Sequence, residues 1–128
     1  MRVLIDSHAL IWAVDEPSRL GPIAASTIRD PAIDRLVSVA TIWEIAIKAG
    51  LKKLALTLPY RQWVEKSLDD LSAELLPIEV AHAEALASLP AHHRDPFDRM
   101  MIAQALVEGT PVVTVDSSFD AYGISRLW

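Results

Sequence analysis

The sequence predicts an α/β fold in which a central parallel sheet is covered by helices on both faces, giving three α/β/α layers. Short apolar runs alternate with longer helical segments along the chain, which is the order that a parallel sheet requires. The chain has 128 residues, of which 52% are apolar, so it can fill the core of one domain and has little room for a second. We therefore predict a single domain over residues 1–128.

The first predicted strand is the apolar run at residues 3–5, which leads directly into a helix over residues 7–14. Pro22 suits the first turn of a helix, so a second helix is expected from there to about Asp30. The apolar run at residues 36–39 then supplies the second strand.

The middle of the chain combines two helices and one strand. Residues 42–49 form the first of these helices, which Gly50 ends. Residues 60–71 carry apolar side chains at helical spacing and form the next helix. The third strand covers residues 75–78, and Pro77 favours a position at its end.

The last part of the chain adds two helices and completes the sheet. The helices are expected at residues 80–89 and 97–108, the second ending at Gly109. Residues 112–115 form the fourth strand, and a weak fifth strand is expected at residues 126–128.

Four carboxylates lie where a short apolar run gives way to the start of a helix or to a tight turn. They are Asp6, Glu44, Asp98 and Asp116. The carboxyl ends of parallel strands lie along one edge of the sheet, where such folds bind ligands, so we expect these acids to converge there. No matching set of Lys or Arg accompanies them, which favours a divalent-metal site with hard oxygen ligands such as Mg²⁺ prefers. Two ions about 4 Å apart would suit hydrolysis of a phosphate ester, and a single ion is also compatible.

Each acid also has a purely structural interpretation. Asp6 suits the N-cap of the first helix, and Asp116 suits an Asx-turn or a cap. Thr41 and Glu44 match a capping box, which is the favoured interpretation for Glu44 taken alone. Asp98 falls in a first helical turn, where the helix dipole favours a carboxylate. Helix caps, however, do not need to lie along the same edge of the sheet, whereas the ligands of one metal site do. The occurrence of all four acids at that edge therefore favours a metal cluster.

Other polar residues near the acids are assigned structural roles. Asp95 precedes Pro96 and is expected to cap the helix that follows, while Asp120 is expected to be exposed and less able to assist the site. His92 and His93 are expected to be solvated. Zinc is disfavoured because the chain has no cysteine and no spaced histidine pair.

The neighbouring arginines, tryptophan and lysines also have expected places. Arg94 and Arg99 can reach a substrate phosphate or pair with the acids, and pairing is the favoured prediction. Trp43 is predicted to pack in the core. The small basic run after Glu44 is expected to form a solvated face that could hold an RNA backbone. Its members are Lys48, Lys52 and Lys53.

Composition narrows the function further. The net charge of -5 argues against a broad basic surface for nucleic acid, but a pair of divalent ions at the acids would reduce it to -1 and invert the local field. Without cysteine there is no disulfide framework. No apolar stretch is long enough for a signal peptide or a membrane span, so a cytoplasmic location without membrane contact is expected.

Four ordered motifs resemble the PIN-domain proteins of the VapC-like toxin type. They are Leu-Ile-Asp-Ser-His at residues 4–8, Ser-Val-Ala-Thr-Ile-Trp-Glu-Ile at 38–45, His-His-Arg-Asp-Pro-Phe-Asp-Arg at 92–99 with Ile-Ala-Gln-Ala at 102–105, and Val-Thr-Val-Asp at 113–116. Each motif alone is weak. The ordered set, which extends from Met1 to at least Phe119, is specific.

The resemblance implies a PIN-like fold and a Mg²⁺- or Mn²⁺-dependent ribonuclease with its acids at Asp6, Glu44, Asp98 and Asp116. Members of the family usually act as the toxin of a toxin–antitoxin pair, commonly form homodimers and bind an antitoxin protein that occludes the acidic site. One departure is that many relatives carry a further acid two residues after the fourth, where this chain has Ser118.

The resulting hypothesis is metal-assisted hydrolysis of RNA, in which Asp6 and Asp98 are the main ligands, Glu44 holds the ion or orients water, and Asp116 completes the shell. One alternative is a phosphotransfer domain with Asp6 as nucleophile, which is disfavoured because no lysine follows Lys66 to neutralise the phosphate. A second alternative is a non-enzymatic acidic module that receives arginines from a partner protein.

Overall fold

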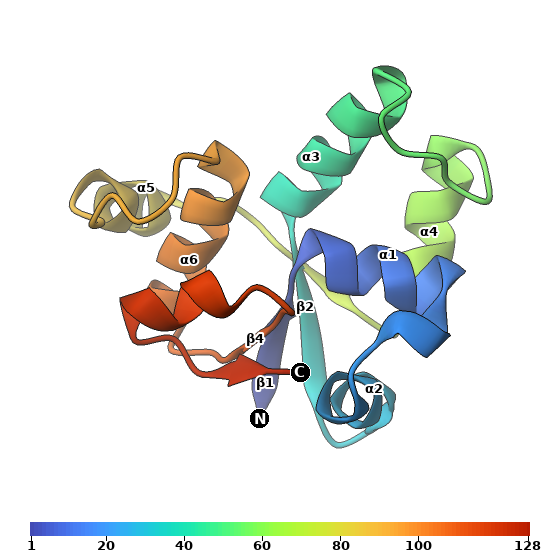
Figure 1. The fold of residues 1–128 in the computed structure, drawn as a ribbon, viewed down its shortest axis with the longest axis horizontal. Coiled ribbons are helices and arrows are strands. Elements are labelled where there is room, and N and C mark those ends of the chain that lie inside the picture. Colours follow the sequence, from blue (N-terminus) through green and yellow to red (C-terminus); the bar gives the residue numbers. More distant parts are fainter.

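The computed structural model describes residues 1–128 and has a five-stranded sheet with helices on both of its faces (Figure 1). The strands are β1 (Arg2–Ile5), β2 (Asp34–Ser38), β3 (Glu74–Leu76), β4 (Val112–Val113) and β5 (Arg126–Leu127). Every strand pair is parallel, which confirms the predicted α/β/α fold class, including the weak fifth strand.

The helices occupy nearly all of the predicted positions. They are α1 (Ser7–Asp15), α2 (Pro22–Arg29), α3 (Val39–Gly50), α4 (Tyr60–Asp70), α5 (Val80–Ala87) and α6 (Pro96–Glu108), with two short 3₁₀ helices, η1 (Pro17–Arg19) and η2 (Ser117–Tyr122). No helix combines the length and apolar character needed to cross a membrane.

Several element boundaries differ from the prediction. Strand β3 ends at Leu76, so Pro77 and Ile78 lie beyond it, and α5 ends at Ala87 rather than at residue 89. Helix α3 begins at Val39 rather than at residue 42, because Ser38 ends β2 and its hydroxyl accepts a hydrogen bond from the Ala40 N–H at 3.0 Å as an N-cap. Strand β4 stops at Val113, so the predicted strand residues Thr114 and Val115 lie beyond it.

The strand order is β3-β2-β1-β4-β5. The chain therefore builds outward from β1 through β2 to β3, and then crosses to the other side of β1 to add β4 and β5. This reversal creates a switch point between β1 and β4, and open α/β sheets bind ligands beyond the carboxyl ends of the strands at such a point. Asp6 follows β1 directly and lies at this place.

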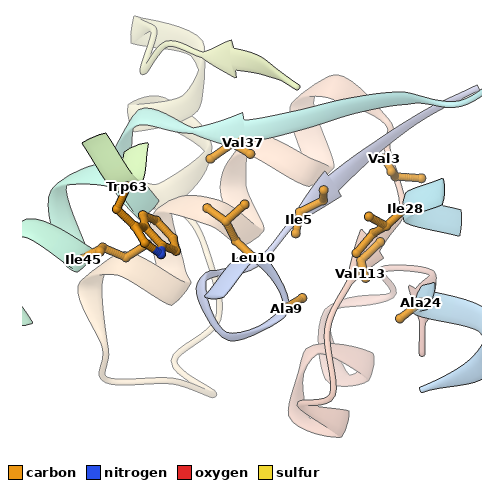
Figure 2. Close-up of a cluster of buried hydrophobic side chains, with 10 residues drawn as sticks. All are labelled: Val3, Ile5, Ala9, Leu10, Ala24, Ile28, Val37, Ile45, Trp63 and Val113. Atoms are coloured by element: carbon orange, nitrogen blue, oxygen red, sulfur yellow. The ribbon is translucent and has the colours of Figure 1, made fainter. Parts of the chain in front are cut away.

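The core has one apolar layer on each side of the sheet. Alternate residues of β1 enter different layers: Val3 and Ile5 join one cluster, and Leu4 joins the other. Figure 2 shows the first cluster, in which Trp63 and Ile45 lie at one end and the α2 residues at the other. The second cluster is completed by residues of α6 and of the segment after β4, including Met101, Ile102, Phe119 and Ile124.

Helix α3 extends from the carboxyl end of β2 and contacts both α1 and α6. The Tyr60 hydroxyl of α4 donates a hydrogen bond to the Ile42 carbonyl at 2.8 Å, which fixes α3 against its neighbour. Helix α3, which carries Glu44, therefore lies beside α1 and α6.

Candidate metal centre

Asp6 combines a capping role with a buried position at the switch point. Its Oδ1 accepts a hydrogen bond from the Ala9 N–H at 2.8 Å, which confirms the predicted N-cap of α1. The residue is only 5% exposed. Burial raises the pKa of the Asp6 carboxyl above its ordinary value, although hydrogen bonds from Thr114 and Ala9 act to lower it.

Glu44 lies inside α3, so the predicted capping box is wrong: Ser38 is the N-cap, and the Thr41 hydroxyl has no hydrogen-bond partner. The side chain of Glu44 is almost completely buried, at 2% exposed. Its Oε2 accepts a hydrogen bond from the Lys48 ammonium at 2.5 Å, whereas Oε1 is buried without a partner. A buried carboxylate oxygen without a partner is costly, and a hydrogen-bond donor or a cation placed beside Oε1 would remove that cost.

Asp95 begins α6 as predicted. Its Oδ1 accepts hydrogen bonds from the backbone N–H groups of Phe97 at 2.8 Å and Asp98 at 3.1 Å. Pro96 occupies the first helical position, where its missing N–H costs nothing. The cap fixes the first turn of α6 and with it the place of Asp98.

The carboxyl of Asp98 is affected by the negative charges of all the neighbouring acids. Burial, followed by the negative charges of Asp95, Glu44, Asp6 and Asp116, raises the pKa of its carboxyl to about 7. The three other predicted acids are therefore close enough to Asp98 to act on it electrostatically. The structure thus brings all four predicted carboxylates to one region of the carboxyl edge.

Asp116 follows β4 and caps η2. Its Oδ1 accepts hydrogen bonds from the Ser118 N–H at 3.0 Å and from the Ser118 hydroxyl at 2.5 Å, which confirms the predicted turn. Its Oδ2 lies 3.6 Å from Nε2 of His93. Burial acts to raise the pKa of Asp116, but the hydrogen bonds from Ser118 and the nearby ring of His93 outweigh it and hold the pKa below its ordinary value.

The prediction that His93 is solvated is wrong. Its side chain is only 9% exposed, and its ring packs edge-on against Phe119 with the ring centroids 5.4 Å apart. His93, Asp98 and Asp116 each offer one ligand atom, and these atoms all lie within 4.8 Å of one another. This group does not include Asp6 or Glu44, although the negative charges of both act on Asp98.

Two further predictions are corrected. Neither arginine pairs with the acids, since Arg94 is exposed and Arg99 donates to backbone carbonyls, including that of Pro90 at 2.9 Å. Trp43 is not a core residue: it is 58% exposed, and its ring meets that of Phe97 edge-on at 5.0 Å.

A cationic groove opens beside Glu44, with a volume of about 460 Å³. Arg19 lies on one side of this groove with its guanidinium 4.5 Å from the centre of the Trp12 ring. The ammonium of Lys48 is paired with Glu44, while Lys53 forms no ion pair. The groove therefore places positive charge next to the acids in a chain whose net charge is negative.

The chemistry of the donors fits a divalent cation. The carboxylates of Asp98 and Asp116, with Asp6 and Glu44 nearby, provide the hard oxygen ligands that Mg²⁺ and Mn²⁺ accept, and His93 adds one nitrogen. A bound cation would give the unpartnered Oε1 of Glu44 a partner, and its positive charge would lower the raised pKa of Asp98.

Comparisons with known proteins agree with this geometry. The sequence profile of the PIN domain matches residues 3–124. Ribonuclease VapC22 of Mycobacterium tuberculosis is 33% identical to this chain over 117 residues, which cover 89% of the chain and 86% of the relative.

Three solved structures share the fold. VapBC2 from Rickettsia felis bound to a DNA fragment from its promoter has a TM-score of 0.76 at 11% identity and covers all of both chains. VapBC-1 from nontypeable Haemophilus influenzae has a TM-score of 0.68 at 14% identity, covering 98% of this chain and 96% of that one. A toxin–antitoxin complex from Klebsiella pneumoniae has a TM-score of 0.59 at 18% identity, covering 90% and 87%.

The resemblance that the motifs suggested is thus confirmed by the profile match across most of the chain and by the identity to VapC22. The chain belongs to the PIN domain family, as a VapC-like member.

Proposed function

We propose that this protein is a Mg²⁺- or Mn²⁺-dependent endoribonuclease that hydrolyses RNA phosphodiester bonds. The observation that carries the proposal is the convergence of Asp6, Glu44, Asp98 and Asp116 at the carboxyl edge of the sheet. Burial and the negative charges of Asp95, Glu44, Asp6 and Asp116 raise the pKa of Asp98 there. The name of the relative VapC22 supports RNA as the substrate.

The four acids would hold the cation, which when bound supplies Lewis-acid polarisation of the phosphate and a more acidic water. The residues of the chain then act by orientation. Lys48 holds Oε2 of Glu44, which leaves Oε1 free to accept a hydrogen bond from an attacking water. Ser118 fixes the carboxylate of Asp116 through two hydrogen bonds. No side-chain nucleophile is required.

The cationic groove supports a path for the RNA strand. Lys53 can contact a phosphate, and the Trp12 ring together with Arg19 provides the aromatic and cationic surface on which bases of single-stranded nucleic acid stack. The groove shares Glu44 with the acidic site, so a strand bound in it would lie beside the acids.

Partner proteins form the second part of the proposal. We infer that the protein binds an antitoxin, and the solved toxin–antitoxin complex of the same fold supports this inference. We also infer that it forms a homodimer in the cytoplasm and that residues 1–128 act as one domain. Helix α3 and its cap expose apolar side chains at four-residue spacing, a surface suited to protein contacts. These are Val39, Trp43, Ile47 and Leu51.

The proposal is tested by RNA cleavage with Mg²⁺ and with Mn²⁺, using a panel of single-stranded RNAs. We expect Asp98→Asn to reduce cleavage more than about a hundredfold, since loss even of an outer-shell partner of a metal costs 10- to 100-fold. Asp6→Asn should act similarly while keeping its cap, because Asn also accepts the capping hydrogen bond. The matched control is Asp120→Asn, since Asp120 is an exposed aspartate close in sequence whose carboxylate pairs with Arg126.

Full activity in Asp98→Asn would contradict the metal role of that residue. If the wild-type protein cleaves no RNA with either ion, the alternative of a non-enzymatic acidic module that binds arginines of a partner protein would replace the proposal. Thermal unfolding of each variant separates loss of the site from loss of the fold.

A further inference from the structure

We propose that His93 binds the divalent cation directly through Nε2, and that this nitrogen ligand makes the centre prefer Mn²⁺ to Mg²⁺. The inference rests on the proposed metal-dependent function, but it concerns a residue outside the four acids and a property, the choice of ion, that the acids alone do not determine.

The distances around His93 suit a shared ion. Its Nε2 lies 3.6 Å from Oδ2 of Asp116, which is too long for a hydrogen bond. Two ligand atoms that each lie about 2.1 Å from one cation are separated by roughly 3 to 4 Å. Asp98 supplies a third ligand atom within 4.8 Å of the other two. One ion can therefore contact all three side chains with small adjustments of their rotamers.

The ring of His93 is held in the orientation that ligation needs. Its Nδ1 lies 3.0 Å from the Tyr122 hydroxyl, so Nε2 points to the acids. Packing against Phe119 and the low exposure of the side chain restrict rotation of the ring. A histidine that binds a metal usually has its other nitrogen fixed by a hydrogen bond in this manner.

The hydrogen bonds also allow the tautomer that ligation requires. The single Ser118 proton is donated to the Asp116 carboxylate, which can only accept, so Nε2 of His93 donates to the Ser118 oxygen at 2.8 Å in the metal-free protein. When Nε2 binds an ion, the ring proton must reside on Nδ1. The Tyr122 hydroxyl can donate to Nδ1 or accept from it, so it satisfies the ring in both states.

A nitrogen ligand changes the selectivity of a site otherwise built from carboxylates. Mg²⁺ is a hard cation that takes oxygen ligands and retains its waters. Mn²⁺ also suits carboxylates, but as a first-row transition ion it gains more from an imidazole nitrogen than Mg²⁺ does. With Asp98 and Asp116 alone, the site would suit Mg²⁺. With His93 added, affinity for Mn²⁺ rises while affinity for Mg²⁺ changes little.

The experiment measures ion binding rather than activity. Mn²⁺ and Mg²⁺ are titrated by calorimetry into the metal-free wild-type protein, His93→Gln and His92→Gln. His92 is the matched control because it is the neighbouring histidine, is exposed and meets the Tyr122 ring edge-on without a hydrogen bond to the acids. We expect His93→Gln to raise the Kd for Mn²⁺ by at least about tenfold, the scale on which metal sites respond to lost supporting partners, and the Kd for Mg²⁺ by less than about threefold. His92→Gln should change neither.

A spectroscopic measurement on the wild-type protein makes the test independent of how the variants fold. Pulsed electron paramagnetic resonance of bound Mn²⁺ should show coupling to a directly bound ¹⁴N nucleus, and this coupling should vanish in His93→Gln. Absence of the coupling in the wild type would overturn the proposal. Equal weakening of Mn²⁺ and Mg²⁺ binding in His93→Gln would also overturn it, because it would assign His93 to positioning Asp116 through Ser118.

The outcomes separate this inference from the proposed function. If Asp98→Asn abolishes ion binding while His93→Gln leaves it unchanged, the acidic metal site stands and the histidine ligand fails. If the wild-type protein binds neither Mn²⁺ nor Mg²⁺, the proposed metal-dependent function fails as well.

Discussion

The carboxyl of Asp98 illustrates how a single residue of the site opposes folding. Burial and the neighbouring negative charges raise its pKa from 3.8 to about 7 in the folded, metal-free protein. The folded state therefore binds a proton more tightly than the unfolded state. The stabilisation from this protonation is complete below the unfolded pKa and is lost as the pH rises through the folded pKa.

Asp98→Asn should remove this pH dependence, because Asn does not titrate. In the presence of a chelator we expect the variant to have a higher Tm than the wild type, with an advantage of a few degrees that is larger at about pH 8 than at about pH 5. Calorimetry of both proteins at the two pH values measures the difference. If the Tm of the two proteins changes with pH by the same amount, the pKa of Asp98 is not raised in the folded protein.

Individual residues also show what a single sequence can predict. The caps at Asp6, Asp95 and Asp116 were predictable, because a cap depends on backbone groups within three residues of the side chain. The role of His93 was not. The groups that orient its ring include Tyr122, which follows α6 and β4 in the sequence and is 29 residues away from His93. A contact between residues so distant in sequence leaves no local pattern.

At the scale of elements, the start of α6 links stability to the site. Asp95 caps this helix and also contributes to the raised pKa of Asp98. We expect Asp95→Ala to be about 1 kcal/mol less stable than Asp95→Asn, since Asn keeps the acceptor oxygen of the cap and Ala does not. Because both variants remove the charge, their comparison isolates the cap.

Urea denaturation of the two variants in the presence of a chelator gives this difference. Equal free energies of unfolding would contradict the importance of the Asp95 cap. In that case the start of α6 would be fixed by Pro96 and by packing of the helix alone.

The α3 boundary shows why element limits were harder to predict than element types. Val39 is β-branched and continues an apolar run, so the sequence predicts that it belongs to the strand. In the structure the Ser38 hydroxyl caps the helix, which therefore begins at Val39. The earlier start removes Glu44 from the capping position that its spacing from Thr41 suggested. Glu44 instead lies deeper in α3, where its buried oxygen lacks a partner.

For the whole molecule, the edge at which the acids meet was predictable and the strand order was not. Parallel strands place their carboxyl ends together whatever their order, so convergence of the acids needed only the fold class. The order β3-β2-β1-β4-β5 depends on contacts between segments distant in sequence. It determines that β1 and β4 are neighbours, and hence that Asp6 and Asp116 flank one switch point.

Charge is the second property of the whole molecule that bears on function. The chain carries a net charge of -5, yet the proposed substrate is a polyanion. The cations of the groove beside Glu44 are not equivalent. Lys48 is paired with Glu44, and Arg19 lies 3.8 Å from Glu16, whereas Lys53 has no acidic partner. Lys53 is therefore the cation most available to a phosphate of the RNA.

Lys53→Gln should consequently weaken RNA binding in a salt-dependent manner. One lost phosphate contact on a single strand reduces the slope of log K against log salt concentration by about 0.7. Lys52→Gln is the matched control, because Lys52 is adjacent and exposed but does not line the groove. Fluorescence anisotropy with a labelled single-stranded RNA and the non-cleaving Asp98→Asn protein as background gives both slopes. If the two lysine variants share the wild-type slope, the strand does not run through this groove, and the RNA must approach the acids from the side of α6.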